Sequence, residues 1–371
     1  MQGITNLDIL GPFPLIITRQ SDTRAPIPST AHSQNRLDVV KTHMTETAIQ
    51  IENLVKVYKE KSSHPVRALD GLDLRVKSGE IFGLLGRNGA GKTTLLRVLT
   101  TLIHPTSGKA TLLGLDINRD ALQVRERICV VLQENAVELF LSVWDNFVTY
   151  ARFHSVPSNE IPRRAEHVIE QFGLSEYVNQ KVIDLSGGLK RRVQVAKVFM
   201  VDKPIVFLDE ATTGMDPINK RGTINAIRDQ AKRGRTIFLT THILEEAEEL
   251  CDTVAIIDHG KCVASGDLPT IKSLVSNAFD IVLAFETPTD EVMRKLQELP
   301  LLSFSFKNNT AELRVRGEEL FVLDIISKIV RNNTLLHIEV NSSSLEDAFI
   351  ELLDRREVRH DDAKSGMGRS T

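Results

Sequence analysis

The residue pattern that most constrains this chain is a glycine-rich turn between a predicted strand and a predicted helix. It has the form G-x-x-x-x-G-K-T and comprises Gly86, Arg87, Asn88, Gly89, Ala90, Gly91, Lys92, Thr93 and Thr94. The apolar run 81–85 before it predicts a buried strand, and Leu95, Val98, Leu99 and Leu102 after it recur at the spacing of one helix face. This context predicts a phosphate-binding P-loop rather than a chance glycine-rich turn.

The P-loop pattern carries a definite chemistry. Its glycines let backbone N–H groups point inward at phosphates, and the helix N-terminus adds positive potential. We expect Lys92 to reach the β- and γ-phosphates and the Thr93 hydroxyl to coordinate Mg²⁺. The chain is therefore predicted to bind a nucleoside triphosphate with magnesium.

Composition narrows the class further. A length of 371 residues predicts about two domains. The 46 Lys and Arg residues against 49 Asp and Glu residues argue against a general nucleic-acid binder. Cys129, Cys251 and Cys262 lack metal-ligand spacing, so we expect small buried hydrophobic residues in a reducing cytosol. No stretch approaches the roughly 18 uninterrupted apolar residues of a membrane-spanning helix.

Three further predicted strands each end on polar side chains. These are Gln133, the pair Asp209 and Glu210, and His242. Ligands bind beyond the carboxyl ends of the strands in open α/β sheets, so all four residues are candidates for a site. An Asp there suits Mg²⁺, and a Glu suits orienting or deprotonating a water. Solvated side chains at ordinary strand ends are the alternative.

A helical insertion separates the first of these strands from the second. Ser142-Val143-Trp144-Asp145 has the form of a capping box that begins a helix. The insertion ends at Leu185-Ser186-Gly187-Gly188, which opens another amphipathic helix and gives a second helix N-terminus suited to anions. By itself, the basic run Lys190-Arg191-Arg192 predicts a solvated helix face.

Together, the P-loop, Gln133, Leu185–Gly188, Asp209-Glu210 and His242 occur in an order and spacing that resemble the nucleotide-binding subunits of ATP-binding cassette (ABC) transporters. The resemblance covers residues 48 to about 272. It implies an α/β P-loop NTPase cassette with a mixed parallel core sheet, an antiparallel β element and a helical subdomain. It also implies ATP and Mg²⁺ as cofactors.

The resemblance assigns roles residue by residue. Tyr58 resembles the aromatic residue that stacks on adenine, and Gln133 the residue that touches Mg²⁺ and the attacking water. Asp209 resembles the Mg²⁺ ligand and Glu210 the catalytic base. His242 resembles the switch that holds the γ-phosphate.

The same resemblance implies partners. Two cassettes, in a homodimer or a paired cassette, face each other head to tail, so that Ser186, Gly187 and Gly188 of one close over ATP on the P-loop of the other and Asp216 crosses the interface. A separate chain supplies an integral membrane permease, which places the cassette in the cytoplasm, peripheral to the inner face of the membrane. No nucleic acid is expected. The segment 134–140, where the permease is expected to dock, departs from the usual pattern, as do Arg87 and Ala211, which replace common prolines.

A second domain follows the cassette. Its order β-α-β-β-α-β predicts a small α+β ferredoxin-like unit, with a closing helix from Ser344. The closing sequence Ser-Leu-Glu-Asp-Ala-Phe resembles multidrug and daunorubicin-resistance exporters. We expect this domain to stabilise a dimer or to regulate, with a small-molecule sensor as the alternative. The predicted division is a disordered extension at 1–46, the ATPase domain at 47–272 with its helical subdomain at about 135–200, the accessory domain at 273–354 and a flexible tail at 355–371.

The extension has four prolines and no basic segment ahead of its apolar stretch, so we expect no signal peptide. One hypothesis is that translation starts at Met44. The expected function is an ATPase that powers a separate permease and exports drugs, lipids or other small molecules. The alternative is a non-transport ABC ATPase acting as an ATP-gated binding or assembly module. A single cassette without a coiled-coil insertion disfavours the DNA-repair and translation types, and the cluster-assembly type stays open.

Overall fold

The computed structural model describes the cassette and most of the accessory domain. The described residues are 46–59, 65–132, 137–274, 278–297, 301–316, 323–324, 326–327, 334–342 and 344–354. The predicted extension, the predicted tail and Gln133 fall outside them, apart from residue 46. Among the helices so described, none is both long and apolar enough to cross a membrane.

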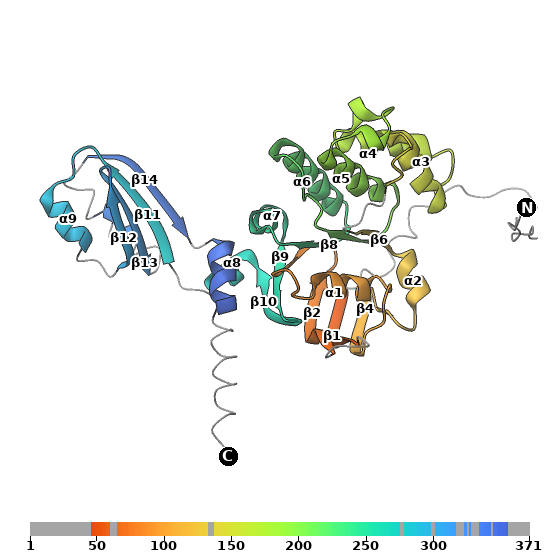
Figure 1. Ribbon diagram of the computed structural model, residues 1–371, viewed down its shortest axis with the longest axis horizontal. Coiled ribbons are helices and arrows are strands. Elements are labelled where there is room, and N and C mark those ends of the chain that lie inside the picture. Colours follow the sequence, from red (N-terminus) through yellow and green to blue (C-terminus); the bar gives the residue numbers. More distant parts are fainter. Residues whose placement is uncertain are drawn as a thin grey trace, which may run out of the picture. The chain divides into compact units, whose positions relative to one another are not determined.

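The centre of the cassette is a six-stranded sheet in the order β10-β9-β3-β8-β7-β6 (Figure 1). Its strands are β3 (Ile81–Leu85), β6 (Ile128–Val131), β7 (Ile205–Asp209), β8 (Thr236–Thr241), β9 (Thr253–Asp258) and β10 (Lys261–Asp267). All pairs are parallel except β10 with β9. Every residue of β3, β7 and β8 is buried, because both faces of the sheet are covered. Because these three strands run parallel, their carboxyl ends lie at one edge of the sheet.

A second, antiparallel sheet covers one face. Its order is β2-β1-β4-β5, with β1 (Thr47–Tyr58), β2 (Val66–Lys77), β4 (Ser107–Leu112) and β5 (Leu115–Asp116). Together with α1 (Lys92–Leu99) and α2 (Ala121–Glu126), it shares a core with the central sheet. Within that core the rings of Phe82 and Phe238 stack with centroids 5.2 Å apart. The predicted antiparallel β element is confirmed.

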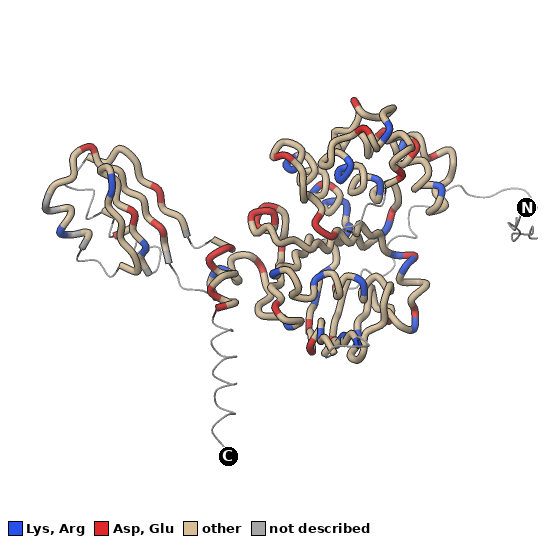
Figure 2. The backbone as a smooth tube through the Cα atoms, viewed as in Figure 1, with Lys and Arg blue, Asp and Glu red and all other residues tan. Residues whose placement is uncertain are grey.

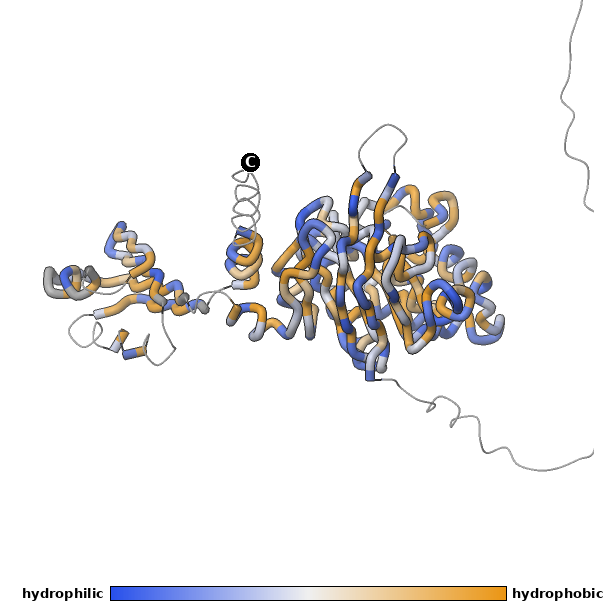
Figure 3. The backbone as a smooth tube through the Cα atoms, turned by 90° about the horizontal axis from the view of Figure 1, so that it is seen from below, coloured by the Kyte–Doolittle hydropathy of each residue, from blue (hydrophilic) through white to orange (hydrophobic). Residues whose placement is uncertain are grey.

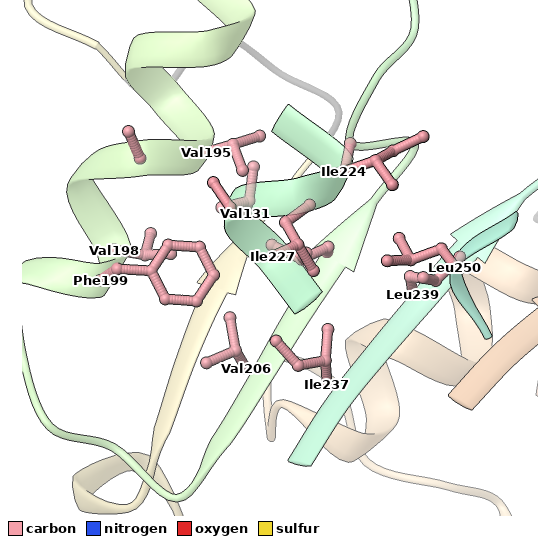
Figure 4. Packing of buried hydrophobic residues seen from close by; sticks show 14 of the residues in the cluster. Val131, Val195, Val198, Phe199, Val206, Ile224, Ile227, Ile237, Leu239 and Leu250 are labelled. Carbon is pink, nitrogen blue, oxygen red and sulfur yellow. The ribbon is translucent and has the colours of Figure 1, made fainter. Parts of the chain in front are cut away.

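Helices cover the opposite face. These are α3 (Val143–Phe153), α4 (Ile161–Gln171), α5 (Gly187–Lys197), α6 (Pro217–Lys232) and α7 (Leu244–Leu250), with short 3-10 turns at Ser175–Tyr177, Val182–Asp184 and Val198–Met200. Val206 and Ile237 of the strands pack toward Phe199 and Ile227 of the helical layer (Figure 4). The Ser142 hydroxyl accepts the Asp145 N–H at 3.0 Å, as the capping box predicts.

The accessory domain is a four-stranded antiparallel sheet in the order β12-β13-β11-β14. Its elements are β11 (Ala278–Phe285), α9 (Asp290–Gln297), β12 (Leu301–Lys307), β13 (Thr310–Arg316) and β14 (Leu335–Ser342). Strand β13 lies between β11 and β12, which α9 connects, and this is the split βαβ arrangement that the sequence predicts. The predicted second helix falls on a stretch of which only residues 323–324 and 326–327 are described, and these are helical.

The closing helix, residues 345–354, packs with the cassette. Leu345, Ala348 and Leu353 are buried in the core formed with the helical layer. The Leu345 N–H donates to the Glu248 carboxylate at 2.8 Å, and Glu248 belongs to α7, along which acidic residues gather (Figure 2). Hydrophobic and hydrophilic residues interleave along the closing helix, as burying one side requires (Figure 3). The boundary predicted after 272 stays a prediction.

Two local predictions are wrong. Helix α1 ends at Leu99, so Leu102 does not share its apolar face and is 57% exposed. The helix ends here because Thr101 adopts a left-handed φ of 61°, which an α-helix does not accommodate. Cys262 is only half-buried, unlike Cys129 and Cys251, because it lies on the edge strand β10.

Lys197 of α5 gives a prediction about stability. Its side chain is buried, with the ammonium 5.4 Å from the centre of the Tyr150 ring, and burial lowers its pKa to about 8. The folded protein thus releases this proton before the unfolded chain does, so folding is penalised below pH 8 and the penalty fades as pH rises toward 10.5. We expect Lys197→Met to raise the free energy of unfolding at pH 7 by about 2 kcal/mol.

Urea denaturation at pH 7 and at pH 10 measures this effect. The advantage of Lys197→Met over the wild type is expected to shrink at the higher pH. Lys190→Met, on the same helix, is the control and is expected to show no such pH-dependent difference. An advantage equal at both pH values would contradict the assignment.

Candidate nucleotide and catalytic site

The P-loop connects β3 to α1 through a backbone that requires glycine. Gly89 and Gly91 adopt φ values of 83° and 110°, in the left-handed region that other residues avoid. A Cβ on Gly91 would lie 2.5 Å from the Ala68 carbonyl, and one on Gly86 would lie 2.5 Å from the Ile257 carbonyl. The loop therefore fits tightly against its neighbours while its inner side stays open.

A cavity of about 350 Å³ lies at this inner side. It is lined by Ala68, Asn88, Gly89, Gly91, Lys92, Thr93, Thr94, Asp209 and Glu210. The Lys92 ammonium is folded over the loop and donates to the carbonyls of Gly86 at 2.6 Å and Arg87 at 3.2 Å. Burial lowers the pKa of Lys92, and the carboxylates of Glu210 and Asp209 oppose that shift. The P-loop, Asp209 and Glu210 thus line one cavity.

Asp209 has the features of a metal ligand. It ends β7 and is 2% exposed, and burial raises its pKa. One carboxylate oxygen, Oδ1, accepts a hydrogen bond from Thr240, while Oδ2 has no hydrogen-bond partner among the described residues. A buried carboxylate oxygen without a partner is costly, and a hard cation satisfies it. Since Thr93 lines the same cavity, the residues present fit Mg²⁺.

Glu210 and His242 form a pair at the same sheet edge. The Glu210 Oε1 lies 2.9 Å from His242 Nδ1. Glu210 adopts a left-handed φ of 51°, and its N–H donates to the Thr240 carbonyl at 2.9 Å. This conformation is unfavourable for a residue with a side chain, so its neighbours must hold it. A carboxylate beside an imidazole at the cavity can accept a proton and orient a water.

Among the described residues, Ser186, Gly187, Asp216 and Tyr58 do not line this cavity. Ser186 caps α5, where its hydroxyl accepts the Leu189 N–H at 3.3 Å, and both Ser186 and Gly187 are exposed. Asp216 caps α6 and accepts the Asn219 N–H at 3.0 Å. Tyr58 ends β1, with the Lys56 ammonium 5.3 Å from its ring centre. In one copy the first two residues of the α5 N-terminus are thus exposed, whereas Gly188 is buried.

The prediction of a solvated Lys190-Arg191-Arg192 face is wrong for both arginines. Arg191 donates to the backbone carbonyls at the ends of β6 and β7, and Arg192 donates to Asn219 and Gly173. The reason is that α5 is packed into the core, so its basic residues find carbonyl partners there. No periodicity distinguishes such a residue from a solvated one.

Thr240 was also not identified from the sequence as a residue of the site. Its partnership with Asp209 follows from the parallel register, which sets Asp209 opposite Thr240 across β7 and β8. The sequence contains that signal as two buried strands that both end on polar residues, but only the pairing of the strands reveals it.

Comparison with known proteins agrees with this geometry. The ABC transporter family profile matches residues 69–213. The daunorubicin/doxorubicin resistance ATP-binding protein DrrA of Streptomyces peucetius is 35% identical over 82% of this chain and 92% of its own length. A Nod factor export ATP-binding protein I of Paraburkholderia xenovorans is 32% identical over 84% of this chain and 99% of its own length.

Solved structures show the same fold. The dimeric structure of a post-hydrolysis state of an ATP-binding cassette bound to ADP and Pi superposes with a TM-score of 0.55 and 24% identity, over 59% of this chain and 98% of that one. Long matches above 30% identity, together with the P-loop and the carboxyl-end acids, establish the relationship. This chain belongs to the ATP-binding subunits of the ABC transporter family and is an ATPase cassette.

Proposed function

We propose that two copies of this chain bind ATP and Mg²⁺ between them and that hydrolysis powers a separate membrane permease that exports a small molecule. The observation that carries the proposal is the division of the site. The cavity holds the P-loop, Asp209 and Glu210, whereas Ser186 and Gly187 are exposed elsewhere on the same copy. A second copy arranged head to tail would bring its α5 N-terminus to the open side of the phosphates.

Each residue then has a role. Lys92 neutralises the phosphates, and Asp209 with Thr93 would hold Mg²⁺, which neutralises charge on the transferred phosphoryl group. Glu210 orients and deprotonates the attacking water, and His242 holds Glu210 and reaches the γ-phosphate. The roles of Tyr58 at the adenine and Gln133 at Mg²⁺ stay predictions.

The names of the relatives support export. One is a daunorubicin/doxorubicin resistance protein and another a Nod factor export protein, and both are called ATP-binding proteins. We infer that the substrate meets a separate integral membrane protein rather than this chain. That places the cassette at the inner face of the membrane through its permease.

Purification from detergent-solubilised membranes tests the proposal. A tagged copy expressed in its native host is expected to retain one polytopic membrane protein in a fixed ratio. Reconstitution of the complex in vesicles is expected to couple ATP hydrolysis to movement of a small molecule. Recovery with soluble partners alone would instead favour an ATP-gated assembly module.

A further inference from the structure

The Arg191 guanidinium joins α5 to two strand ends of the catalytic edge. Its Nη1 donates to the Leu132 carbonyl at 2.9 Å and to Gln194 Oε1 at 2.8 Å. Its Nη2 donates to the Glu210 carbonyl at 3.1 Å and also to the Asp209 carbonyl. One side chain thus bridges α5, the end of β6 and the two acidic residues at the end of β7.

The two carbonyls at β7 are the peptide groups on either side of the Glu210 Cα. The Asp209 carbonyl belongs to the peptide before Glu210, and the Glu210 carbonyl to the peptide after it. Fixing both planes fixes φ and ψ of Glu210 and therefore the direction of its Cα–Cβ bond, while His242 Nδ1 lies 2.9 Å from the carboxylate at the other end of the side chain. The φ of 51° is unfavourable for Glu, so contacts must hold it. Glu210 also lies beyond the last parallel pair of β7 with β8, which is Asp209 with Thr240.

Arginine suits this position better than other cations. Its donors lie in a rigid planar fork that can bond several acceptors at once, whereas the Lys ammonium is a single point. Burial lowers the pKa of Arg191, and the carboxylates of Asp209, Glu210 and Glu246 oppose that shift. The Leu132 carbonyl also accepts a hydrogen bond from Gln194 Nε2 at 3.0 Å, and the Glu210 carbonyl accepts one from the Thr213 N–H at 3.3 Å, so the guanidinium adds to these bonds.

We propose that Arg191 is a positioning residue for ATP hydrolysis, which holds the Glu210 carboxylate toward the cavity by fixing the two peptides around it. This inference rests on the proposed role of Glu210 as the catalytic base. It makes the orientation of Glu210 depend on α5, the helix whose N-terminus faces the second copy. The same side chain connects α5 to the last carbonyl before Gln133.

Steady-state kinetics of Arg191→Met and Arg191→Lys test the proposal. Both are expected to lower kcat by roughly 10- to 100-fold, the range for a misplaced catalytic group, with KM for ATP changed less than about twofold. Arg191→Lys is expected to show the same loss of kcat, because one ammonium cannot fix both peptides. Lys190→Met is the matched control and is expected to keep wild-type kcat.

The double variant Arg191→Met with Glu210→Gln separates positioning from general damage. If Arg191 acts through Glu210, the double variant is expected to be no slower than Glu210→Gln alone. Losses that multiply would show an independent structural effect and overturn the proposal. If Arg191→Met does not fold, Arg191→Lys decides, and wild-type kcat in that variant would equally overturn it. Full turnover by Glu210→Gln would instead refute the base assignment itself.

Discussion

Glu210→Gln is expected to slow ATP hydrolysis by roughly 10²-fold or more, the loss typical of removing a general base. The amide keeps the size of the side chain but cannot take the proton of the attacking water. Because Glu210 lines the cavity without contributing to the P-loop itself, ATP binding is expected to persist. Phosphate release at saturating ATP measures the loss, and calorimetry measures the retained affinity.

A matched substitution controls for the change of charge. Glu249→Gln alters an exposed carboxylate on α7, away from the cavity lining, and is expected to hydrolyse ATP at the wild-type rate. If Glu210→Gln turned over as fast as this control, Glu210 would not be the base. Retained ATP binding with lost turnover is the result expected of a general base.

Lys92→Ala is expected to weaken ATP binding instead. The ammonium is buried at the loop, bonded to the carbonyls of Gly86 and Arg87, and is placed to exchange them for phosphate oxygens. Loss of a hydrogen bond to a charged group costs about 1.5–3 kcal/mol, which corresponds to roughly a 10- to 150-fold rise in Kd. Titration calorimetry with ATP and Mg²⁺ measures it.

The control for this variant is Lys190→Ala, which removes a lysine outside the cavity lining and is expected to keep the wild-type Kd. Circular dichroism verifies that the loop change leaves the fold intact. An unchanged Kd in Lys92→Ala would remove Lys92 from the binding site. Glu210→Gln is thus expected to lose turnover, whereas Lys92→Ala is expected to lose affinity for ATP.

The sequence predicted those parts of the site that local physics determines. The glycines of the P-loop are required by positive φ angles and close backbone contacts, so their spacing reveals the turn without further knowledge. Buried parallel strands appear as continuous apolar runs, and the polar residue that follows each run marks the carboxyl edge. For this reason Asp209, Glu210 and His242 could be found from the sequence.

The rest depends on which elements meet, and no local pattern encodes that. The bond between Thr240 and Asp209 needs the register of β7 with β8. Arg191 has the same sequence signal whether it is solvated or packed against carbonyls, so its bonds to the strand ends could be found only from the packing of α5. The closing helix follows the accessory strands along the chain, yet its apolar side packs in the cassette core.

We expect ATP to be held between two copies of this chain. Sedimentation of the Glu210→Gln protein with saturating ATP and Mg²⁺ tests it most directly, because slow hydrolysis preserves the bound state. We expect the mass of a dimer with ATP and of a monomer without it, and loss of the dimer when Ser186→Arg is added while each monomer still binds ATP. A protein that stays monomeric with ATP bound would show that one copy alone holds the nucleotide.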